Sequence, residues 1–330
     1  MEASFEVYQY RFTIRSSFVA PLEHLRQDFE YFAASPAADS VLIELFDADP
    51  PFDQIPDVDA SVYTPRNVVY RAGGRRYIDY HGRALALQDE SSRHLQLYSR
   101  DANLLYEATY LYLLSQIGQY LDRHRLHRIH ALGVVIRNKA ALVLLPMGGG
   151  KSTLAVNLLK HSEVKLLSDD SPFIDSGGHA LPYPLRIGVL EGSENTIPAE
   201  QRRLIQRMEF GPKYLVNYSY FKDRVAKSVE VGLVVIGVRN PGNACRIEEV
   251  SKLAGLRACL ANCVIGVGLF QGLEFILNSS GWELLGQSRV GMSRLLSCYQ
   301  MLRRARVCRV HLGRDSELNA QTILDYASSI

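Results

Sequence analysis

The sequence lacks any apolar run long enough to cross a membrane, and it lacks a strong excess of charge of either sign. Its longest apolar stretches, such as VGLVVIGV at 231–238, have the length of a strand, whereas a membrane helix needs about 20 residues. The formal net charge of the 330-residue chain is +2, so no basic field indicates nucleic acid or an acidic lipid surface. We therefore expect neither nucleic acid nor a membrane as a partner.

Cysteine is scarce, and its spacing does not match a metal site. The five cysteines lie in the last third of the chain, and none forms a C-x-x-C pair. The first ten residues, MEASFEVYQY, lack the basic-then-apolar layout of a secretory signal. An odd number of cysteines without metal spacing is typical of free thiols in a reducing compartment, so we expect a cytoplasmic protein. Hydrophobic residues, at 47%, are too plentiful for a mainly disordered chain.

The composition changes near residue 100. Residues 1–100 alternate β-branched and aromatic segments with Pro, Gly and Asp turns, which predicts a strand-rich N-terminal region. The segment 103–125 has apolar residues at helical spacing. We interpret it as a core helix rather than a membrane-surface helix, because its polar face includes Glu107 and two glutamines and has no lysine. We predict a mixed α/β fold with two parts, 1–100 and 101–330.

The segments beyond residue 180 give weaker signals. We expect helices over 197–209 and 247–264, separated by a buried strand over 228–239. The chain then closes on a helix, a strand over 307–312 and a helix over 316–328.

A glycine loop between a strand and a helix is the strongest signal. Apolar strand segments at 133–136 and 140–145 are followed by PMGGGKST at 146–153 and then by a helical pattern. Glycines allow backbone N–H groups to turn toward an anion, and the helix N-terminus adds its dipole. In such loops the lysine reaches nucleotide phosphates and the next hydroxyl binds Mg²⁺. The predicted phosphate-binding residues are Gly148, Gly149, Gly150, Lys151, Ser152 and Thr153.

The loop departs from the full G-x-x-x-x-G-K-[ST] pattern, because Leu145 stands at the position of the first glycine. Pro146 removes one N–H group from the loop, and Met147 adds bulk beside the phosphate path. Two interpretations stay open: the loop binds nucleotide, or it has lost this ability.

An acidic pair, Asp169 and Asp170, follows the next strand at 164–167 and comes 18 and 19 residues after Lys151. One helix and one return strand fill this interval, so both carboxylates are expected at the sheet edge that holds the loop. Since Mg²⁺ prefers oxygen ligands, the candidate metal ligands are Ser152, Asp169 and Asp170. One of the carboxylates is also suited to accept the proton of an attacking hydroxyl.

Three histidines, His124, His127 and His130, are spaced by three residues before the first of these strands. A zinc site on a helix would use such spacing, but no fourth ligand is present nearby. We therefore favour a structural role over a zinc site.

The segment 128–170 resembles the HPr kinase/phosphorylase group, P-loop kinases with a phosphoenolpyruvate-carboxykinase-like core. The resemblance rests on Arg128-Ile129-His130-Ala131, the glycine loop, and an acidic pair that comes unusually early. Over 100–330 it is looser, and Leu185-Arg186-Ile187-Gly188 only echoes the family's second glycine-rich signature. The resemblance implies a P-loop core within a mixed sheet, and ATP and Mg²⁺ as cofactors.

The resemblance also implies roles for single residues. Asp169 matches the acid/base that takes the hydroxyl proton, and Asp170 matches its neighbour at the metal. Lys151 and His130 match residues beside the phosphates.

The function that the resemblance implies is ATP- and Mg²⁺-dependent transfer of a phosphoryl group to a serine or threonine hydroxyl of a peptide or protein. Divergent members of the group act in peptide natural-product biosynthesis, where a partner enzyme of the pathway is also expected. HPr itself is not the expected substrate, because the chain departs from the family in several places. Leu145 replaces the first loop glycine, the second signature is only echoed, the C-terminal basic segment is not found, and residues 1–100 do not look like the usual regulatory domain. The alternatives are an inactive pseudoenzyme that binds a peptide or a partner as a scaffold, and a kinase of small molecules. The sequence leaves the oligomeric state open.

Overall fold

The computed structural model describes residues 1–89, 91–189, 197–207, 211–264 and 281–330. These residues form two compact units, and the first contains most of residues 1–120 together with 204–207 and 211–213. The chain passes into the second unit within helix α2 (Ala102–Arg123), at Tyr120 and Leu121. The division predicted from the sequence, at residues 100 and 101, stays a prediction.

The first unit is built on an eight-stranded mixed sheet of order β1-β2-β3-β8-β7-β6-β5-β4. The pairs β2–β3 and β3–β8 are parallel, and the other neighbours are antiparallel. Helix α1 (Val19–Asp28), which we did not expect, connects β2 to β3. The strands are β1 (Glu2–Val7), β2 (Tyr10–Ser16), β3 (Val41–Asp47), β4 (Ala60–Tyr63), β5 (Val68–Ala72), β6 (Arg75–Asp79), β7 (Leu85–Asp89) and β8 (His94–Ser99).

Aromatic side chains hold α1 and α2 against each other and against this sheet. The Phe12 ring lies 5.1 Å from the Phe5 ring and 5.3 Å from the Phe29 ring, which follows α1. The Tyr106 hydroxyl of α2 donates a 2.6 Å hydrogen bond to Asp28 at the end of α1. The predicted helix over 103–125 is therefore confirmed as a core helix. In the described part of the chain, no helix combines the length and the hydropathy that crossing a bilayer would need.

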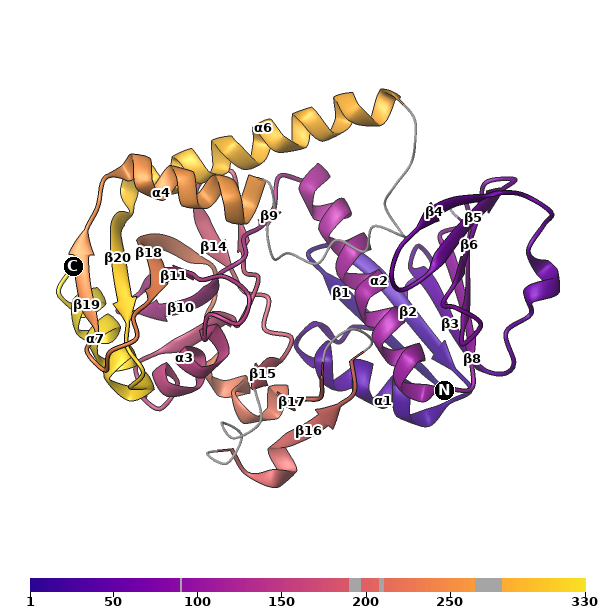
Figure 1. Cartoon of the computed structure of the whole chain (residues 1–330), viewed down its shortest axis with the longest axis horizontal. Coiled ribbons are helices and arrows are strands. Elements are labelled where there is room, and N and C mark those ends of the chain that lie inside the picture. The colour runs from indigo at the N-terminus through magenta and orange to yellow at the C-terminus, as the bar shows by residue number, and fades with distance from the viewer. Residues whose placement is uncertain (90, 190–196, 208–210, 265–280) are drawn as a thin grey trace. The chain divides into compact units, whose positions relative to one another are not determined.

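The second unit contains a nine-stranded mixed sheet (Figure 1). Its main path is β12-β10-β11-β18-β14-β13-β9, and β20 pairs with both β18 and β19. The strands of this sheet are β9 (His127–Arg128), β10 (Leu132–Ile136), β11 (Lys139–Leu144), β12 (Lys165–Ser168), β13 (Phe173–Ile174), β14 (His179–Leu181), β18 (Val229–Arg239), β19 (Arg246–Glu249) and β20 (Arg306–Leu312). A small sheet has the order β15-β17-β16, formed by β15 (Ile187–Val189), β17 (Lys213–Val216) and β16 (Arg202–Ile205).

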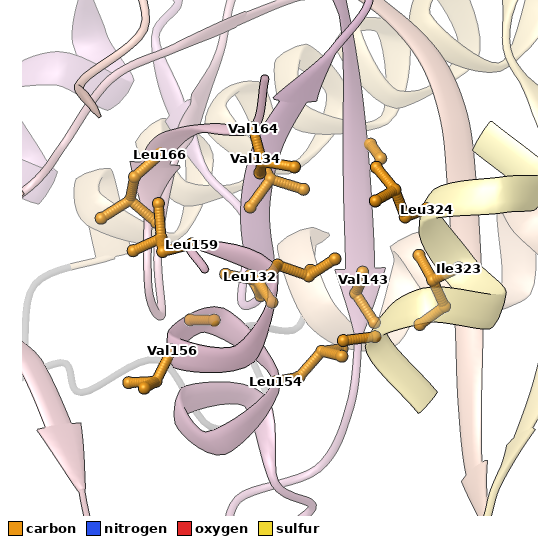
Figure 2. Packing of buried hydrophobic residues seen from close by; sticks show 14 of the residues in the cluster. Leu132, Val134, Val143, Leu154, Val156, Leu159, Val164, Leu166, Ile323 and Leu324 are labelled. Carbon is orange, nitrogen blue, oxygen red and sulfur yellow. The ribbon is translucent and has the colours of Figure 1, made fainter. Parts of the chain in front are cut away.

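Helices cover both faces of the nine-stranded sheet because its strands alternate apolar side chains between two cores. In β10, Leu132 and Val134 face one core, whereas Val135 faces the other. The first core includes residues of α3 (Lys151–Leu158) and α7 (Ser316–Ser328), as Figure 2 shows. The second core includes residues of α4 (Lys252–Cys259) and α6 (Gly281–Arg304).

Two sequence predictions are wrong in part. The segment 197–209 was expected to be a helix, but Ala199–Gln201 forms one 3-10 turn and β16 follows it. Pairing with β17 supplies the hydrogen bonds that a helix would have provided, and the Arg202 guanidinium stacks over the Tyr214 ring. Residues 208–210 lie outside the described part. The helix expected over 247–264 starts only at Lys252, because 247–249 belong to β19, which pairs with β20.

Candidate functional site

The glycine loop lies at the carboxyl end of β11, and α3 starts directly after it. Gly148 and Gly150 have φ values of +74° and +97°, a region that residues with a Cβ rarely adopt. Gly150 is the N-cap of α3 and provides no side chain to cap the helix. Among the described residues, no side-chain cap is found at this helix start, which suits an anion. Gly149 donates its N–H to Pro146 O over 2.9 Å, closing a turn within the loop.

The position where the pattern departs from a standard phosphate loop has a structural explanation. Leu145 is 1% exposed, and its side chain points into the core against Gly237 of the neighbouring parallel strand β18. A Cβ placed on Gly237 would lie 2.5 Å and 2.6 Å from two carbons of the Leu145 side chain. The leucine side chain therefore lies in the core, because a glycine on the next strand makes room for it.

The Lys151 side chain is 7% exposed and is held by three neighbours. Its Nζ lies 2.9 Å from Leu145 O, 2.9 Å from His130 Nε2 and 3.4 Å from Pro146 O. Because an ammonium group can only donate, His130 Nε2 accepts, and the proton of the ring lies on Nδ1. The structure thus brings His130 and the loop lysine together.

Asp169 lies at the same sheet edge as the loop. Strands β11 and β12 run in the same direction, since each is antiparallel to β10, which lies between them. Their carboxyl ends meet at one edge, and there Ser152 Oγ donates a 2.8 Å hydrogen bond to Asp169 Oδ2. The backbone N–H of Gly188 donates to the same oxygen over 3.2 Å. Asp169 is 7% exposed as a residue, and its carboxylate is held from two sides.

The second acid of the pair is more accessible. The Asp170 side chain is 57% exposed, and its Oδ1 lies 3.6 Å from Lys151 Nζ and 3.4 Å from His130 Nδ1. The His130 side chain is 3% exposed, and its Nδ1 makes no hydrogen bond of normal geometry. A buried N–H donor next to an exposed carboxylate and a lysine gives the site a free hydrogen-bonding position that points to a ligand.

Thr153 lies in the first turn of α3, where its carbonyl accepts a hydrogen bond from the Asn157 side chain. Thr153 lies next to Ser152, and its hydroxyl has no hydrogen-bond partner among the described residues.

Arg239, which we did not identify from the sequence, also lies at this site. It ends β18, and a Cβ placed on Gly150 would lie 2.5 Å from its Nη2. The sequence did place Arg239 at the end of a predicted buried strand, and ligands of such sheets bind at the carboxyl ends of the strands. Nothing in the sequence indicated that β18 would be the neighbour of β11.

His127, the middle one of the three histidines, has hydrogen-bond partners at both ring nitrogens. His127 is buried, with Nδ1 2.8 Å from Asp122 Oδ1 and Nε2 2.9 Å from Ser293 Oγ. Arg294 donates to the same carboxylate over 2.6 Å, and this network anchors β9 next to His130. Among the residues that the structure describes, no three His, Cys, Asp or Glu side chains are grouped to hold a metal ion.

The donor set at the loop nevertheless fits Mg²⁺ bound together with a nucleotide. Such an ion takes oxygen ligands and uses only one or two protein carboxylates, because phosphates and waters supply the rest. The Ser152 hydroxyl and the Asp169 carboxylate are already adjacent, and Asp170 is accessible beside them. The uncapped N-terminus of α3 and Lys151 fit the phosphates.

Comparisons with known proteins give little beyond this geometry. No protein-family model and no curated protein matches the chain. Among solved structures, the chain is similar to the HPr(Ser) kinase/phosphatase from Coxiella burnetii at 14% identity, covering 61% of this chain and 95% of that one, with a TM-score of 0.27.

Proposed function

We propose that this protein is an ATP- and Mg²⁺-dependent kinase that transfers a phosphoryl group to a serine or threonine hydroxyl of a peptide or protein. The observation that carries the proposal is the hydrogen bond between Ser152 and Asp169. It joins the residue after the loop lysine to a carboxylate that a separate strand delivers to the same edge. A surface glycine turn would have no reason to meet a buried acid in this way.

In this proposal each residue of the site has a separate role. Lys151 and the N-terminus of α3 hold the phosphates and neutralise negative charge that develops on them. Ser152 and Asp170 hold Mg²⁺, which supplies further charge neutralisation on the phosphates when bound. Asp169, oriented by Gly188 N–H, accepts the proton of the attacking hydroxyl. The Nδ1 proton of His130 is available to a phosphate oxygen.

The acceptor is proposed to be a peptide or protein, as in the peptide-modifying relatives that the sequence resembles. In that setting a partner enzyme of a peptide-biosynthetic pathway would supply or receive the substrate.

A second candidate is a scaffold that has this fold but no catalysis. It is favoured by one observation, that the Lys151 ammonium already has three protein acceptors in His130 Nε2, Leu145 O and Pro146 O. Nucleotide binding must redirect at least one of these N–H groups toward a phosphate. If the loop keeps them, the lysine only stabilises the loop, and the protein binds a peptide or partner without turnover.

Phosphoryl transfer from labelled ATP to a library of Ser- and Thr-containing peptides tests the proposal. The matched set replaces each acceptor hydroxyl by Ala, and a parallel panel holds small hydroxylated molecules. The kinase account predicts label in the hydroxyl peptides only, and none with Asp169→Asn. Label in the small acceptors alone would identify a small-molecule kinase, and no transfer to any acceptor despite tight peptide binding would support the scaffold.

A further inference from the structure

We infer that Arg294 is a positioning residue that holds His130 in place beside the loop lysine, an inference that rests on the proposed function. Arg294 lies on α6, outside the glycine loop and outside the acidic pair. It is connected to His130 by two routes, one through the π-helical turn Leu260–Val264 and one through Asp122 and His127. All of these residues belong to the second unit.

The first route consists of two consecutive carbonyl groups of the π-helical turn. The Nη1 of Arg294 donates a 3.2 Å hydrogen bond to Cys263 O. The preceding carbonyl, Asn262 O, accepts the backbone N–H of His130 over 3.0 Å. Single π-helical turns are frequent at functional sites. The guanidinium thus fixes the turn, and the turn fixes the backbone of His130.

The second route is a carboxylate that Arg294 shares with a histidine. The Nε and Nη2 of Arg294 donate to the two oxygens of Asp122 over 3.1 Å and 2.6 Å, and both side chains are nearly buried. His127 Nδ1 lies 2.8 Å from the same carboxylate, three residues before His130. A bidentate arginine–carboxylate pair fixes the geometry of both groups. One guanidinium therefore anchors the segment 127–130 at both ends.

His130 depends on this anchoring, because its ring has to meet two partners at once. Its Nε2 accepts a hydrogen bond from Lys151 over 2.9 Å, and its Nδ1 lies 3.4 Å from Asp170 Oδ1. A shift of the His130 backbone would move both nitrogens away from these positions. Since a misplacement of about 1 Å can cost an enzyme about 100-fold in rate, a residue that fixes this backbone affects transfer without touching the substrate.

The variants Arg294→Lys and Arg294→Gln test this role, with Arg303→Gln as the control. Lysine keeps a cation beside Asp122, but it lacks the planar fork that bonds several partners in fixed directions. Arg303 is exposed on the same helix, and its guanidinium bonds the Gln300 side chain among the described residues. Melting temperatures check that each variant is folded, and Arg294→Lys keeps the test available if the glutamine variant does not fold.

Steady-state phosphoryl transfer to a Ser- or Thr-containing peptide gives the first readout. We expect the kcat of Arg294→Lys to fall by about 10- to 100-fold, with the KM of the peptide unchanged, and Arg303→Gln to match the wild type. In a His130→Ala background, Arg294→Lys should cause no further loss, because Arg294 acts through that histidine. A further loss of the same size, or a wild-type kcat in Arg294→Lys, would overturn the inference and leave the kinase proposal intact.

Nitrogen NMR of the full chain with isotope-labelled histidine gives a second readout that needs no turnover. The signals of His130 are those that disappear in His130→Ala. The wild type should show a protonated Nδ1 and an unprotonated Nε2, and Arg294→Lys should show a mixture of the two tautomers. Identical signals in Arg294→Lys and the wild type would overturn the inference. A wild type that shows this change but transfers no phosphoryl group would contradict the proposed function while supporting the positioning of His130.

Discussion

Ser152 Oγ lies 2.8 Å from Asp169 Oδ2, so the hydroxyl that follows the loop lysine shares a hydrogen bond with the first acid of the pair. Asp169 is the residue to which we assign proton transfer, and it is nearly buried. Asp169→Asn keeps the shape and an acceptor for Ser152 but removes the base. We expect phosphoryl transfer to fall by about 10²–10⁴-fold, the usual contribution of a positioned base, with the melting temperature little changed.

The control for this substitution is Asp325→Asn on α7, an exposed carboxylate that bonds only the neighbouring Gln321 side chain among the described residues. It should leave the transfer rate unchanged. Equal rates for Asp169→Asn and the wild type would remove Asp169 from the mechanism.

Gly237 and Leu145 form a packed pair that shapes the loop. Gly237→Ala would place a methyl group 2.5 Å from the Leu145 side chain, and such overpacking costs about 1–3 kcal/mol of unfolding free energy. Leu145→Ala alone removes a buried side chain and costs about 2–5 kcal/mol. In the double variant the added methyl group has room, so the loss measured by urea denaturation should be smaller than the sum of the two single losses. Strict additivity would mean that the two residues do not contact each other.

Asp122 gives the second unit a pH-dependent stability. Burial alone would raise the pKa of Asp122, but hydrogen bonds from His127 and Arg294 outweigh it and leave this pKa below its ordinary value. A carboxyl whose pKa is depressed by folding stabilises the protein above its unfolded pKa, about 4. That contribution is lost as the pH falls through the folded pKa.

Asp122→Asn should therefore lower the unfolding free energy at pH 7 by about 3 kcal/mol, because Arg294 loses its buried partner. The difference between wild type and variant should shrink as the pH falls below about 4. If the difference in unfolding free energy between wild type and variant stays constant down to pH 2, the loss does not come from the ionised carboxylate of Asp122.

The buried thiols of the second unit should be unreactive in the native protein. Hydrogen bonding to Cys298 and burial raise the pKa of Cys263, and hydrogen bonding to Cys259 and burial also raise the pKa of Cys298. Since the thiolate is the reactive form, iodoacetamide at pH 7.5 should modify these residues only after unfolding. Partly buried Cys245 should react first, as mass spectrometry of digested protein would show. Rapid native labelling of Cys298 would contradict this packing.

The loop, the helix after it and the acidic pair could be predicted from the sequence because they follow one another along the chain. Glycine positions, helical spacing and a short interval to the next strand are local signals. Local signals also gave a wrong prediction at residues 202–205, whose composition indicates a helix. These residues instead form β16 and pair with β17, a segment about ten residues further along the chain.

Arg239, Gly188 and the Leu145–Gly237 contact could not be predicted, because each depends on which strands become neighbours. The sequence does not state that β18 lies beside β11, nor that β15 delivers the Gly188 N–H to Asp169. Strand order arises from the burial of both faces of the sheet, so it is a property of the whole unit.

The central claim is that the loop at Lys151 binds Mg·ATP, and calorimetric titration of the wild type and Lys151→Ala tests it most directly. We predict wild-type binding of micromolar strength, about −8 kcal/mol, that disappears in the variant while the fold, checked by circular dichroism, persists. No binding by the wild type at millimolar Mg·ATP would contradict the claim and would leave the scaffold as the account of this protein.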